Sequence, residues 1–326
     1  MKADYGRAFT CLAVAVILSF FPCVECGGAV MRAKPFVKWA GGKGQLLEQL
    51  DSLLPKDFGE RKDIVYIEPF VGGGAMLFHV LAKYPNVSAA VINDANAELI
   101  DVYVTIKTNS EALITRLSEI QAEFYGCGSE YARQGMYLKM RDKFNARDGD
   151  ALEISALFIF LNKTCFNGLY RVNANGEFNV PFGKAKKPLI SDADNIRALS
   201  EVLQKVTIAN GDYEDVMKIV KGNAFFYFDP PYRPLTQSAA FTAYAKGGFD
   251  DAEQRRLAQF CRKLDIEGYQ WILSNSDPHN TNPEDNFFEE LYQGFDIRRV
   301  SAARAINSRG DRRGKITELA IRNYKE

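Results

Sequence analysis

The chain has 326 residues, 47% hydrophobic and 25% charged, which is enough to bury one large core or two modest ones. Lysine plus arginine and aspartate plus glutamate each number 41, so the overall charge does not favour a nucleic-acid partner. Six cysteines, three of them in the first 26 residues, do not form a disulfide framework, and Cys23 and Cys26 are a single CxxC, a weak zinc signal. His79 and His279 lack a triad context, which argues against histidine-based hydrolysis, and no metal site is predicted.

Residues 1–30 differ from the rest of the chain. Residues 11–24 are almost continuously apolar behind Lys2 and Arg7, too short to span a membrane comfortably and closer to the apolar region of a signal peptide. An export signal, an interfacial anchor and an upstream extension before a natural start at Met31 all fit. We favour the extension, because the sequence after Met31 is typical of cytosolic proteins, and therefore expect a cytoplasmic location without a firm membrane partner.

A glycine turn at residues 41–43 precedes an amphipathic helix predicted at about 45–54. A Walker phosphate loop is excluded, because Gly44 stands where that motif needs serine or threonine and the earlier glycine is missing. Trp39 and Lys43 then become candidate ligand contacts. The alternative is a helix cap with a surface lysine.

A predicted strand at 64–68 is followed by a glycine-rich turn and a helix. Glycines let the backbone approach a ligand closely and open the helix N-terminus toward it. The pattern is Phe70-x-Gly72-x-Gly74 rather than the GxGxxG of dinucleotide sites, since position 77 is leucine. An adenosine-bearing cofactor other than a dinucleotide is therefore favoured.

A second strand is predicted at 89–94, and it ends in an acid, Asp94, about twenty residues after the glycine-rich turn. Asp94 at this place suits a bidentate hydrogen bond to ribose hydroxyls. The alternative is that Asp94 caps a helix predicted at 95–108.

Residues 108–190 are predicted to form an inserted, mainly helical domain. Apolar residues at spacings of three and four predict helices at 110–124, 131–145 and 151–162. Asn-Gly pairs at 167 and 175 mark two turns with a hairpin between them. Aromatic, amide and basic residues alternate there, as in a loop that reads nucleic acid, although a plain surface hairpin is the alternative.

The sheet pattern resumes at 205–209 and at 224–228, and the second of these strands stops at Asp229-Pro230-Pro231-Tyr232. Five apolar residues without alternation predict a strand covered on both faces of a parallel sheet. Two prolines make the following loop extended and stiff, and ligands bind at the carboxyl ends of such strands. A proline turn with a packed tyrosine explains these four residues equally well.

The remainder of the chain completes the sheet. Residues 233–250 suit a mobile loop over a site. Seven basic residues and one acid between Arg298 and Lys315 suit a patch that follows phosphates, with a solvated loop as the alternative. The other predicted elements are a helix, a strand ending in small polar residues and a strand pair, at 251–264, 270–277, 295–305 and 316–323.

These segments resemble, in order from Met31 onward, the D12 class of DNA adenine-N6 methyltransferases, the family of the Dam and DpnII-type enzymes, in its alpha arrangement. Residues 1–30 have no counterpart. The resemblance implies a Rossmann-like methyltransferase sheet with helices on both faces at 31–107 and 191–326, and an inserted target-recognition domain with a β-hairpin at 108–190. The motifs that carry it are Lys38–Lys43, Phe70–Gly74, Phe166–Arg171, Gly176–Phe182, Asp229–Tyr232, Ser274–Asp277 and Ala305–Ser308.

The implied reaction moves a methyl group from S-adenosylmethionine to N6 of adenine in duplex DNA. The amine is a poor nucleophile because its lone pair is delocalised, and Asp229 and the Pro230 carbonyl offer acceptors for its hydrogens. Direct in-line transfer then needs neither a covalent intermediate nor a metal. The adenine must flip out of the duplex, and Tyr232 is placed to stack on it.

The resemblance also implies individual contacts. Lys38 and Arg171 would read guanines, Leu169 and Pro181 would contact thymine methyl groups, and Phe166, with Asn167 beside it, would wedge next to the flipped base, which suggests GATC as the target. Some relatives carry tyrosine where this chain has phenylalanine at 166. The implied cofactor contacts are Trp39, Lys43, Phe70, Gly72, Gly74, Asp94, Asp212, Tyr213 and Asp229.

Three other functions stay open at this point. An RNA adenine-N6 methyltransferase would use the same loop on single-stranded RNA. A non-catalytic protein that binds DNA or cofactor, and a membrane-attached protein suggested by residues 11–24 alone, are the others. Whether a cognate restriction endonuclease is a partner is also open.

Overall fold

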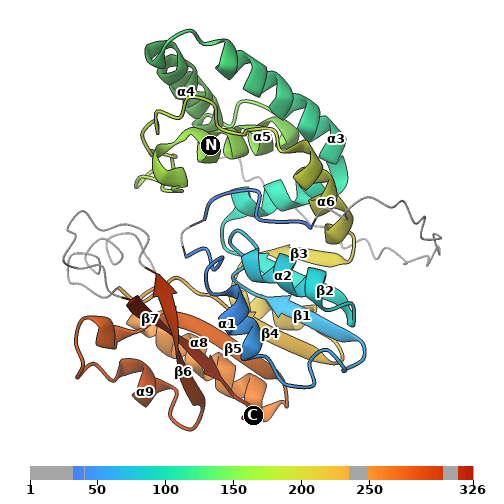
Figure 1. Ribbon diagram of the computed structural model, residues 1–326, viewed down its shortest axis with the longest axis vertical. Coiled ribbons are helices and arrows are strands. Elements are labelled where there is room, and N and C mark those ends of the chain that lie inside the picture. The colour runs from blue at the N-terminus through green and yellow to red at the C-terminus, as the bar shows by residue number, and fades with distance from the viewer. Residues whose placement is uncertain (1–31, 40, 235–248, 304–314, 326) are drawn as a thin grey trace, which may run out of the picture. The chain divides into compact units, whose positions relative to one another are not determined.

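The computed structural model describes residues 32–39, 41–234, 249–303 and 315–325, which contain a seven-stranded sheet (Figure 1). The strand order is β3-β2-β1-β4-β5-β7-β6; the first five pair in parallel, and β7 is antiparallel to both of its neighbours. The strands are β1 Ile64–Glu68, β2 Val87–Asp94, β3 Val206–Asn210, β4 Ala224–Phe228, β5 Gln270–Ser276, β6 Asp296–Ala303 and β7 Lys315–Arg322.

The predicted strands and helices are confirmed, with ends that differ by a few residues, while α6 and α9 were not predicted. The helices are α1 Leu47–Ser52, α2 Ala75–Lys83, α3 Ala97–Gly126, α4 Glu130–Asn145, α5 Ala151–Thr164, α6 Ala193–Leu203, α8 Asp251–Ile266 and α9 Phe287–Leu291. Short 3-10 turns are η1 Phe166–Gly168, η2 Tyr213–Lys218 and η3 Pro278–Asn280.

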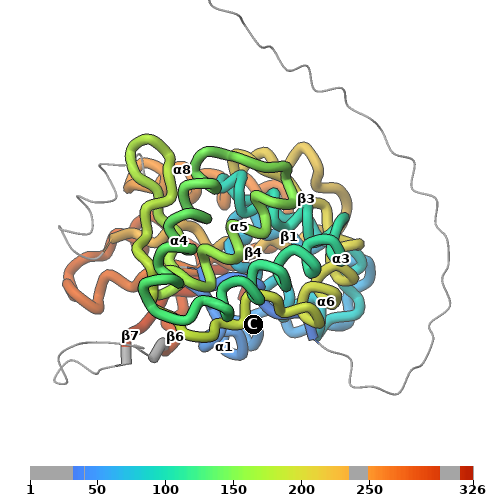
Figure 2. The backbone as a smooth tube through the Cα atoms, turned by 90° about the horizontal axis from the view of Figure 1, so that it is seen from above, coloured from blue at the N-terminus to red at the C-terminus, as the bar shows by residue number. Residues whose placement is uncertain are grey.

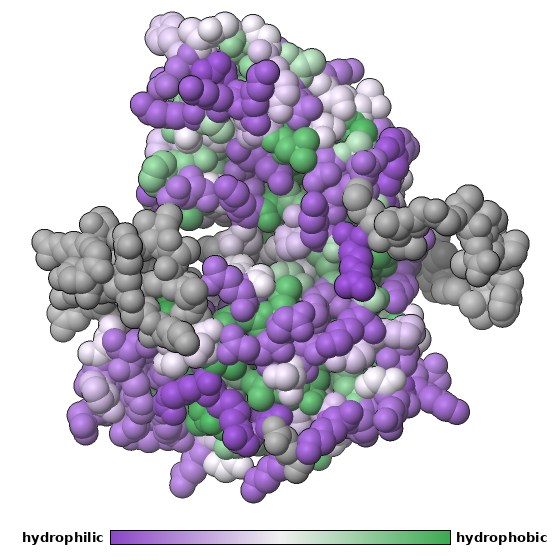
Figure 3. Space-filling model, viewed as in Figure 1, coloured by the Kyte–Doolittle hydropathy of each residue, from purple (hydrophilic) through white to green (hydrophobic). Residues whose placement is uncertain are grey.

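Hydrophobic cores cover both faces of the sheet, as predicted. Successive residues of a strand point to opposite faces, so Tyr66 belongs to a core that includes residues of α1, α2, α3 and α6, and Ile67 belongs to a core that includes residues of α8 and α9. All five residues of β4 are buried, which explains why this strand is apolar throughout. Hydrophilic residues cover most of the face seen in Figure 3.

Helices α3, α4 and α5 lie together above the sheet in Figure 1, and they lie over it in the view from above (Figure 2). Side chains of Asn96, Ser129 and Asp150 cap the N-termini of the three helices by accepting backbone N–H bonds. The predicted helices 95–108 and 110–124 form one helix, interrupted at Asn109, where φ is −136°. Residues 31–326 make up one compact unit, and their division into a sheet domain and a recognition domain stays a prediction.

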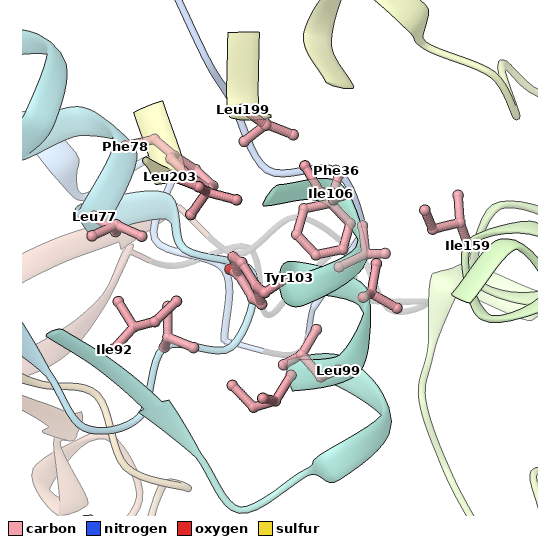
Figure 4. Close-up of a cluster of buried hydrophobic side chains, with 14 of the residues drawn as sticks. Phe36, Leu77, Phe78, Ile92, Leu99, Tyr103, Ile106, Ile159, Leu199 and Leu203 are labelled. Atoms are coloured by element: carbon pink, nitrogen blue, oxygen red, sulfur yellow. The ribbon is translucent and has the colours of Figure 1, made fainter. Parts of the chain in front are cut away.

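Tyr103 of α3 lies at the centre of the buried cluster in Figure 4 and supports the glycine turn after β1. Its ring meets Phe36 edge-on at 4.9 Å, and its hydroxyl donates to the Gly72 carbonyl at 3.0 Å. A Cβ on Gly74 would lie 2.6 Å from the Tyr103 hydroxyl, and φ of Gly74 is +73°, so only glycine suits this position. The core thus fixes the shape of the turn.

Several predicted features fall outside the described residues. They are the extension at 1–30, most of the loop at 233–250, the basic segment at 304–314 and the motif Ala305–Ser308. Within the described ranges, no helix has the length and apolar character that crossing a membrane requires.

Replacing Tyr103 by phenylalanine tests the support of the glycine turn. Tyr103→Phe leaves the buried Gly72 carbonyl without this donor, so we expect the free energy of unfolding to fall by about 1–3 kcal/mol in urea denaturation. Tyr125→Phe is the matched control, because its hydroxyl donates to Pro188 at an exposed position where water can replace it. Equal losses in both variants would contradict the role given to Tyr103.

Candidate active site

A cavity of about 920 Å³ opens at the carboxyl ends of β1 and β4, where the strand order reverses. Every residue predicted for catalysis or for cofactor binding lines this cavity, and so does Lys38. The predicted residues that meet here are Lys38, Trp39, Lys43, Phe70, Gly72, Gly74, Asp94, Asp212, Tyr213, Asp229, Pro230, Pro231 and Tyr232.

Asp229 follows the fully buried strand β4, and its side chain is only 20% exposed. Burial raises the pKa of this carboxyl group to about 6, because the charged form loses hydration, while the ammonium of Lys43 opposes the rise. The Lys43 Nζ lies 2.7 Å from Oδ1 of Asp229. The carboxylate is therefore ionised at neutral pH despite its position.

Lys43 is a buried counterion, 3% exposed, so the alternative of a surface lysine is wrong. Its ammonium donates to the Gly41 carbonyl at 3.0 Å and lies 3.7 Å from a carboxylate oxygen of Glu318. It also lies 4.3 Å from the centroid of the Tyr232 ring, within range of a cation–π contact. Lys43 thus contacts both the acid and the aromatic residue of the loop after β4.

Glu318 is a site residue for which no role was predicted. The Tyr232 hydroxyl donates to Oε2 of Glu318 at 2.5 Å, which fixes the tyrosine ring. Glu318 pairs with Ser276, the last residue of β5, because β7 is antiparallel and brings its first residues to the carboxyl edge of the sheet. The sequence alone shows a glutamate near the start of the last strand, but it does not show which strand lies beside it.

Glu68, the last residue of β1, is a second acid in the cavity for which we predicted no role. It is 2% exposed, and its Oε2 has no hydrogen-bond partner within the described part of the chain. Burial, and next the negative charge of Asp229, raise the pKa of Glu68 well above its ordinary value. An orphaned carboxyl oxygen of this kind fits a polar group of a bound ligand.

Asp94 joins the end of β2 to the glycine turn. Its Oδ2 accepts from the Gly72 N–H at 3.0 Å, and its Oδ1 accepts from the Asn96 N–H at 2.9 Å. Burial raises the pKa of Asp94, and these N–H donors oppose the rise. The alternative that Asp94 caps the next helix is wrong, since Asn96 accepts from Leu99 and is the cap.

Trp39 packs directly against the glycine turn. A Cβ on Gly72 would lie 2.6 Å from Cδ1 of Trp39, and φ of Gly72 is +48°, so this close approach needs glycine. The indole stacks on Tyr170 at 5.5 Å and on Phe158 at 6.3 Å. The turn is therefore held between Trp39 on one side and the Tyr103 hydroxyl on another.

One wall of the cavity is aromatic and consists of Phe70 and Tyr213, and the charged Asp212 lies at its rim. The Phe70 and Tyr213 rings lie 5.0 Å apart. Arg256 pairs with the Asp212 carboxylate at 2.7 Å and covers the Tyr213 ring at 4.7 Å. This wall suits a flat aromatic group next to a polar edge.

Two fully buried amides, Gln254 and Asn275, hold the loop after β4, and their roles were not predicted. Gln254 Nε2 donates to the Pro231 carbonyl at 3.1 Å, and Asn275 Nδ2 donates to Gln254 Oε1 at 3.0 Å. Asn275 Oδ1 accepts from the Arg233 N–H at 3.2 Å. The stiffness predicted from the two prolines is thus reinforced from α8 and β5.

The predicted hairpin exists, but its turn is different. Antiparallel bridges join Cys165 to Phe182 and Val172 to Phe178, so the chain turns at 173–176 around the second Asn-Gly pair. Both Asn-Gly pairs lie in turns, as predicted, and the first is part of η1, with φ of +56° and +65°. The arms of the hairpin lie on either side of the second pair and not between the two pairs.

The residues predicted for DNA contact are all exposed. Phe166 and Leu169 are 52% and 41% exposed, so both side chains are accessible to a partner. Arg171 Nε donates to Asn179 Oδ1 at 2.7 Å, which orients the guanidinium. The exposed set is Lys38, Phe166, Asn167, Leu169, Arg171 and Pro181.

The seven-stranded sheet and the cavity at its switch point are consistent with a methyltransferase fold. Residues 39–306 match the family described as D12 class N6 adenine-specific DNA methyltransferase, and the chain belongs to this family. The resemblance noted from the sequence motifs is thereby confirmed, and DNA is favoured over the RNA alternative.

Curated relatives agree with this family. The chain is 48% identical to the type II methyltransferase M.MjaIII of Methanocaldococcus jannaschii over 90% of this chain and 100% of that protein. It is 34% identical to a DNA adenine methylase of Vibrio cholerae, over 88% and 95% of the two chains. It is 32% identical to the DNA adenine methylase of Escherichia coli K12, over 88% and 94%.

The described ranges contain no group of three or more histidine, cysteine, aspartate or glutamate side chains suited to a metal ion.

Removing the Lys43 charge tests its action on Asp229. Because the ammonium lowers the pKa of Asp229, Lys43→Met should raise that pKa above about 6, as measured by the pH dependence of the carboxyl 13C shift. Lys205→Met is the control, since Lys205 contacts the Val87 carbonyl at the opposite edge of the sheet and should leave the pKa unchanged. An unaltered pKa in Lys43→Met would contradict the ion pair.

Proposed function

We propose that this protein is a site-specific DNA methyltransferase that uses S-adenosylmethionine, flips the target adenine out of the duplex and modifies its N6 within GATC. The observation that carries the proposal is the single cavity that brings the Asp229–Tyr232 loop together with the Phe70–Gly74 turn and Asp94. We also propose a cytoplasmic location. A cognate restriction endonuclease is a further candidate partner, supported by the type II name of the archaeal relative.

The cavity suits S-adenosylmethionine, which methyltransferases generally use and which supplies an electrophilic methyl group when bound. Its volume lies in the range of cofactor sites. Asp94 would hold the ribose hydroxyls, because each of its oxygens accepts one backbone N–H and retains a second lone pair. Asp212 and Tyr213 would flank the adenine ring, with Phe70 packed against Tyr213, and the orphaned oxygen of Glu68 offers a partner to a polar group. Trp39, Lys43, Gly72 and Gly74 complete the proposed contacts.

Asp229 and Pro230 would activate the target amine. Lys43 holds Oδ1 of Asp229, which leaves Oδ2 and the Pro230 carbonyl as acceptors for the two N6 hydrogens. These bonds draw the lone pair out of conjugation, and the carboxylate stabilises the positive charge that develops on N6. Pro231 keeps the loop extended, and Tyr232, fixed by Glu318, would stack on the flipped base.

The exposed side chains of the hairpin support reading of duplex DNA. Lys38 and Arg171 can donate to O6 and N7 of guanine in the major groove, the commonest specific protein–DNA contact. Leu169 and Pro181 would contact thymine methyl groups. Phe166 would fill the space beside the flipped adenine, with Asn167 in the same turn, and together these contacts suggest GATC.

Digestion of DNA from expressing cells tests the reaction and the target together. Nucleases that cut only unmethylated or only methylated GATC should show full modification with the wild-type protein and none with Asp229→Ala. The variant should still bind S-adenosylmethionine in calorimetry, through Asp94 and the aromatic wall. Modification at another sequence would keep the reaction and overturn GATC, whereas unchanged turnover by Asp229→Ala would overturn the mechanism.

The raised pKa of Asp229 predicts the pH dependence of methylation. A protonated Asp229 cannot both pair with the Lys43 ammonium and accept a hydrogen bond from the target amine. The value of kcat/KM should therefore fall about tenfold per pH unit as the pH drops below about 6. If Asp229 had the ordinary pKa of an aspartate, methylation would decline only at a lower pH. A flat profile down to pH 5 would show that ionised Asp229 is not required.

A further inference from the structure

Two buried asparagines hold the segment 34–38, of which Pro35, Val37 and Lys38 line the cavity. Asn195 of α6 accepts from the Lys34 N–H and donates to the Lys34 carbonyl, both at 3.0 Å. Asn162 of α5 makes the same pair with Lys38, both bonds at 2.9 Å. The two side chains are 1% and 3% exposed, so water does not substitute for either.

Asn162 makes one contact that Asn195 lacks. Its second Nδ2 hydrogen goes to the Gly168 carbonyl at 3.0 Å, in the first turn of the hairpin segment. One amide group therefore forms hydrogen bonds with three backbone groups of two segments that are distant in the sequence. No other side chain of this size has two N–H donors and a carbonyl acceptor, so no other residue type can make all three bonds.

The Lys38 side chain and the same turn also touch directly. A Cβ on Gly168 would lie 2.7 Å from Cβ and 2.6 Å from Cδ of Lys38, so the lysine stem lies against the bare backbone of the turn. The Lys38 stem is thus placed by packing on Gly168, and its backbone is placed by Asn162. The exposed Phe166 and Leu169 flank this contact in sequence.

We propose that Asn162 is a specificity-determining positioning residue. It fixes Lys38 relative to the turn at 166–168, so that the lysine and the hairpin side chains meet DNA bases as one rigid element. Asn162 is buried and acts only through these neighbours. This inference rests on the proposed function, in which Lys38 reads a guanine.

The physical consequence is a loss of discrimination rather than a loss of charge. A loosened Lys38 keeps its ammonium group and its attraction to phosphates, which carry no sequence information. What it loses is the fixed approach to a base edge, and a well-placed base contact is the source of discrimination between bases. Binding to DNA should therefore persist while the choice of sequence weakens.

The test uses Asn162→Ala, with Asn195→Ala as the matched control. Substrates are hemimethylated duplexes containing either GATC or the same site with the guanine replaced by adenine. The measured quantity is the ratio of kcat/KM for the two duplexes, with DNA affinity and thermal stability measured alongside. We expect Asn162→Ala to lower the ratio about tenfold. Asn195→Ala should lower stability similarly and leave the ratio near that of the wild type.

A double-mutant cycle with Lys38→Ala shows whether Asn162 acts through the lysine. If it does, adding Asn162→Ala to Lys38→Ala lowers the ratio no further. Equal effects of Asn162→Ala and Asn195→Ala, a wild-type ratio in Asn162→Ala, or additive effects in the cycle would overturn the inference. If Asn162→Ala does not fold, Asn162→Ser, which keeps one hydrogen-bonding group, takes its place in the same comparison.

The wild-type protein and the Lys38→Ala variant test the proposed function separately from the inference. If the wild type prefers another sequence, GATC fails, and the same ratio is measured on the site that it does modify. If Lys38→Ala leaves discrimination unchanged, Lys38 is not a reader, and the assignment and the inference fail together. If Lys38→Ala lowers discrimination and Asn162→Ala does not, only the inference fails.

Discussion

The central constraint on this protein is an aspartate at the end of a strand that is buried along its whole length. Removal of water raises the pKa of Asp229, and Lys43 at 2.7 Å keeps the carboxylate charged at neutral pH. Lys43 comes from the turn before α1, and Glu318, which holds Tyr232, comes from β7. Residues near both ends of the described chain therefore meet at the end of β4.

Most of the sheet could be predicted from the sequence because its signals are local. The apolar run of β4 and its two prolines, or the strand and glycines before α2, lie within a dozen residues and depend on backbone chemistry. Local signals misplaced other features. Asp94 and Asn96 are both acceptable caps by composition, and the two Asn-Gly pairs are both acceptable hairpin turns, so only the fold decides between them.

The partners within the site could not be predicted, because they depend on strand pairing and on contacts between distant segments. Glu318 reaches Tyr232 because β7 runs antiparallel to β5. Gln254 lies on an amphipathic helix, where a buried amide is indistinguishable in sequence from an exposed one. Asn162 is the last residue of a predicted helix, but its three hydrogen bonds go to backbone atoms, which every residue type carries.

In the proposed function, base reading and amine activation depend on two lysines, Lys38 and Lys43, that lie close together in the sequence. Lys38 is tied to the hairpin by Asn162, and Lys43, five residues later, is tied to the carboxylate of Asp229. In the proposed mechanism a target amine would present to Asp229 the same kind of N–H donor that Lys43 presents, so substrate and lysine would share this carboxylate. Under the proposed function, one short segment, residues 38–43, therefore supplies both a base-reading side chain and the counterion of the activating carboxylate.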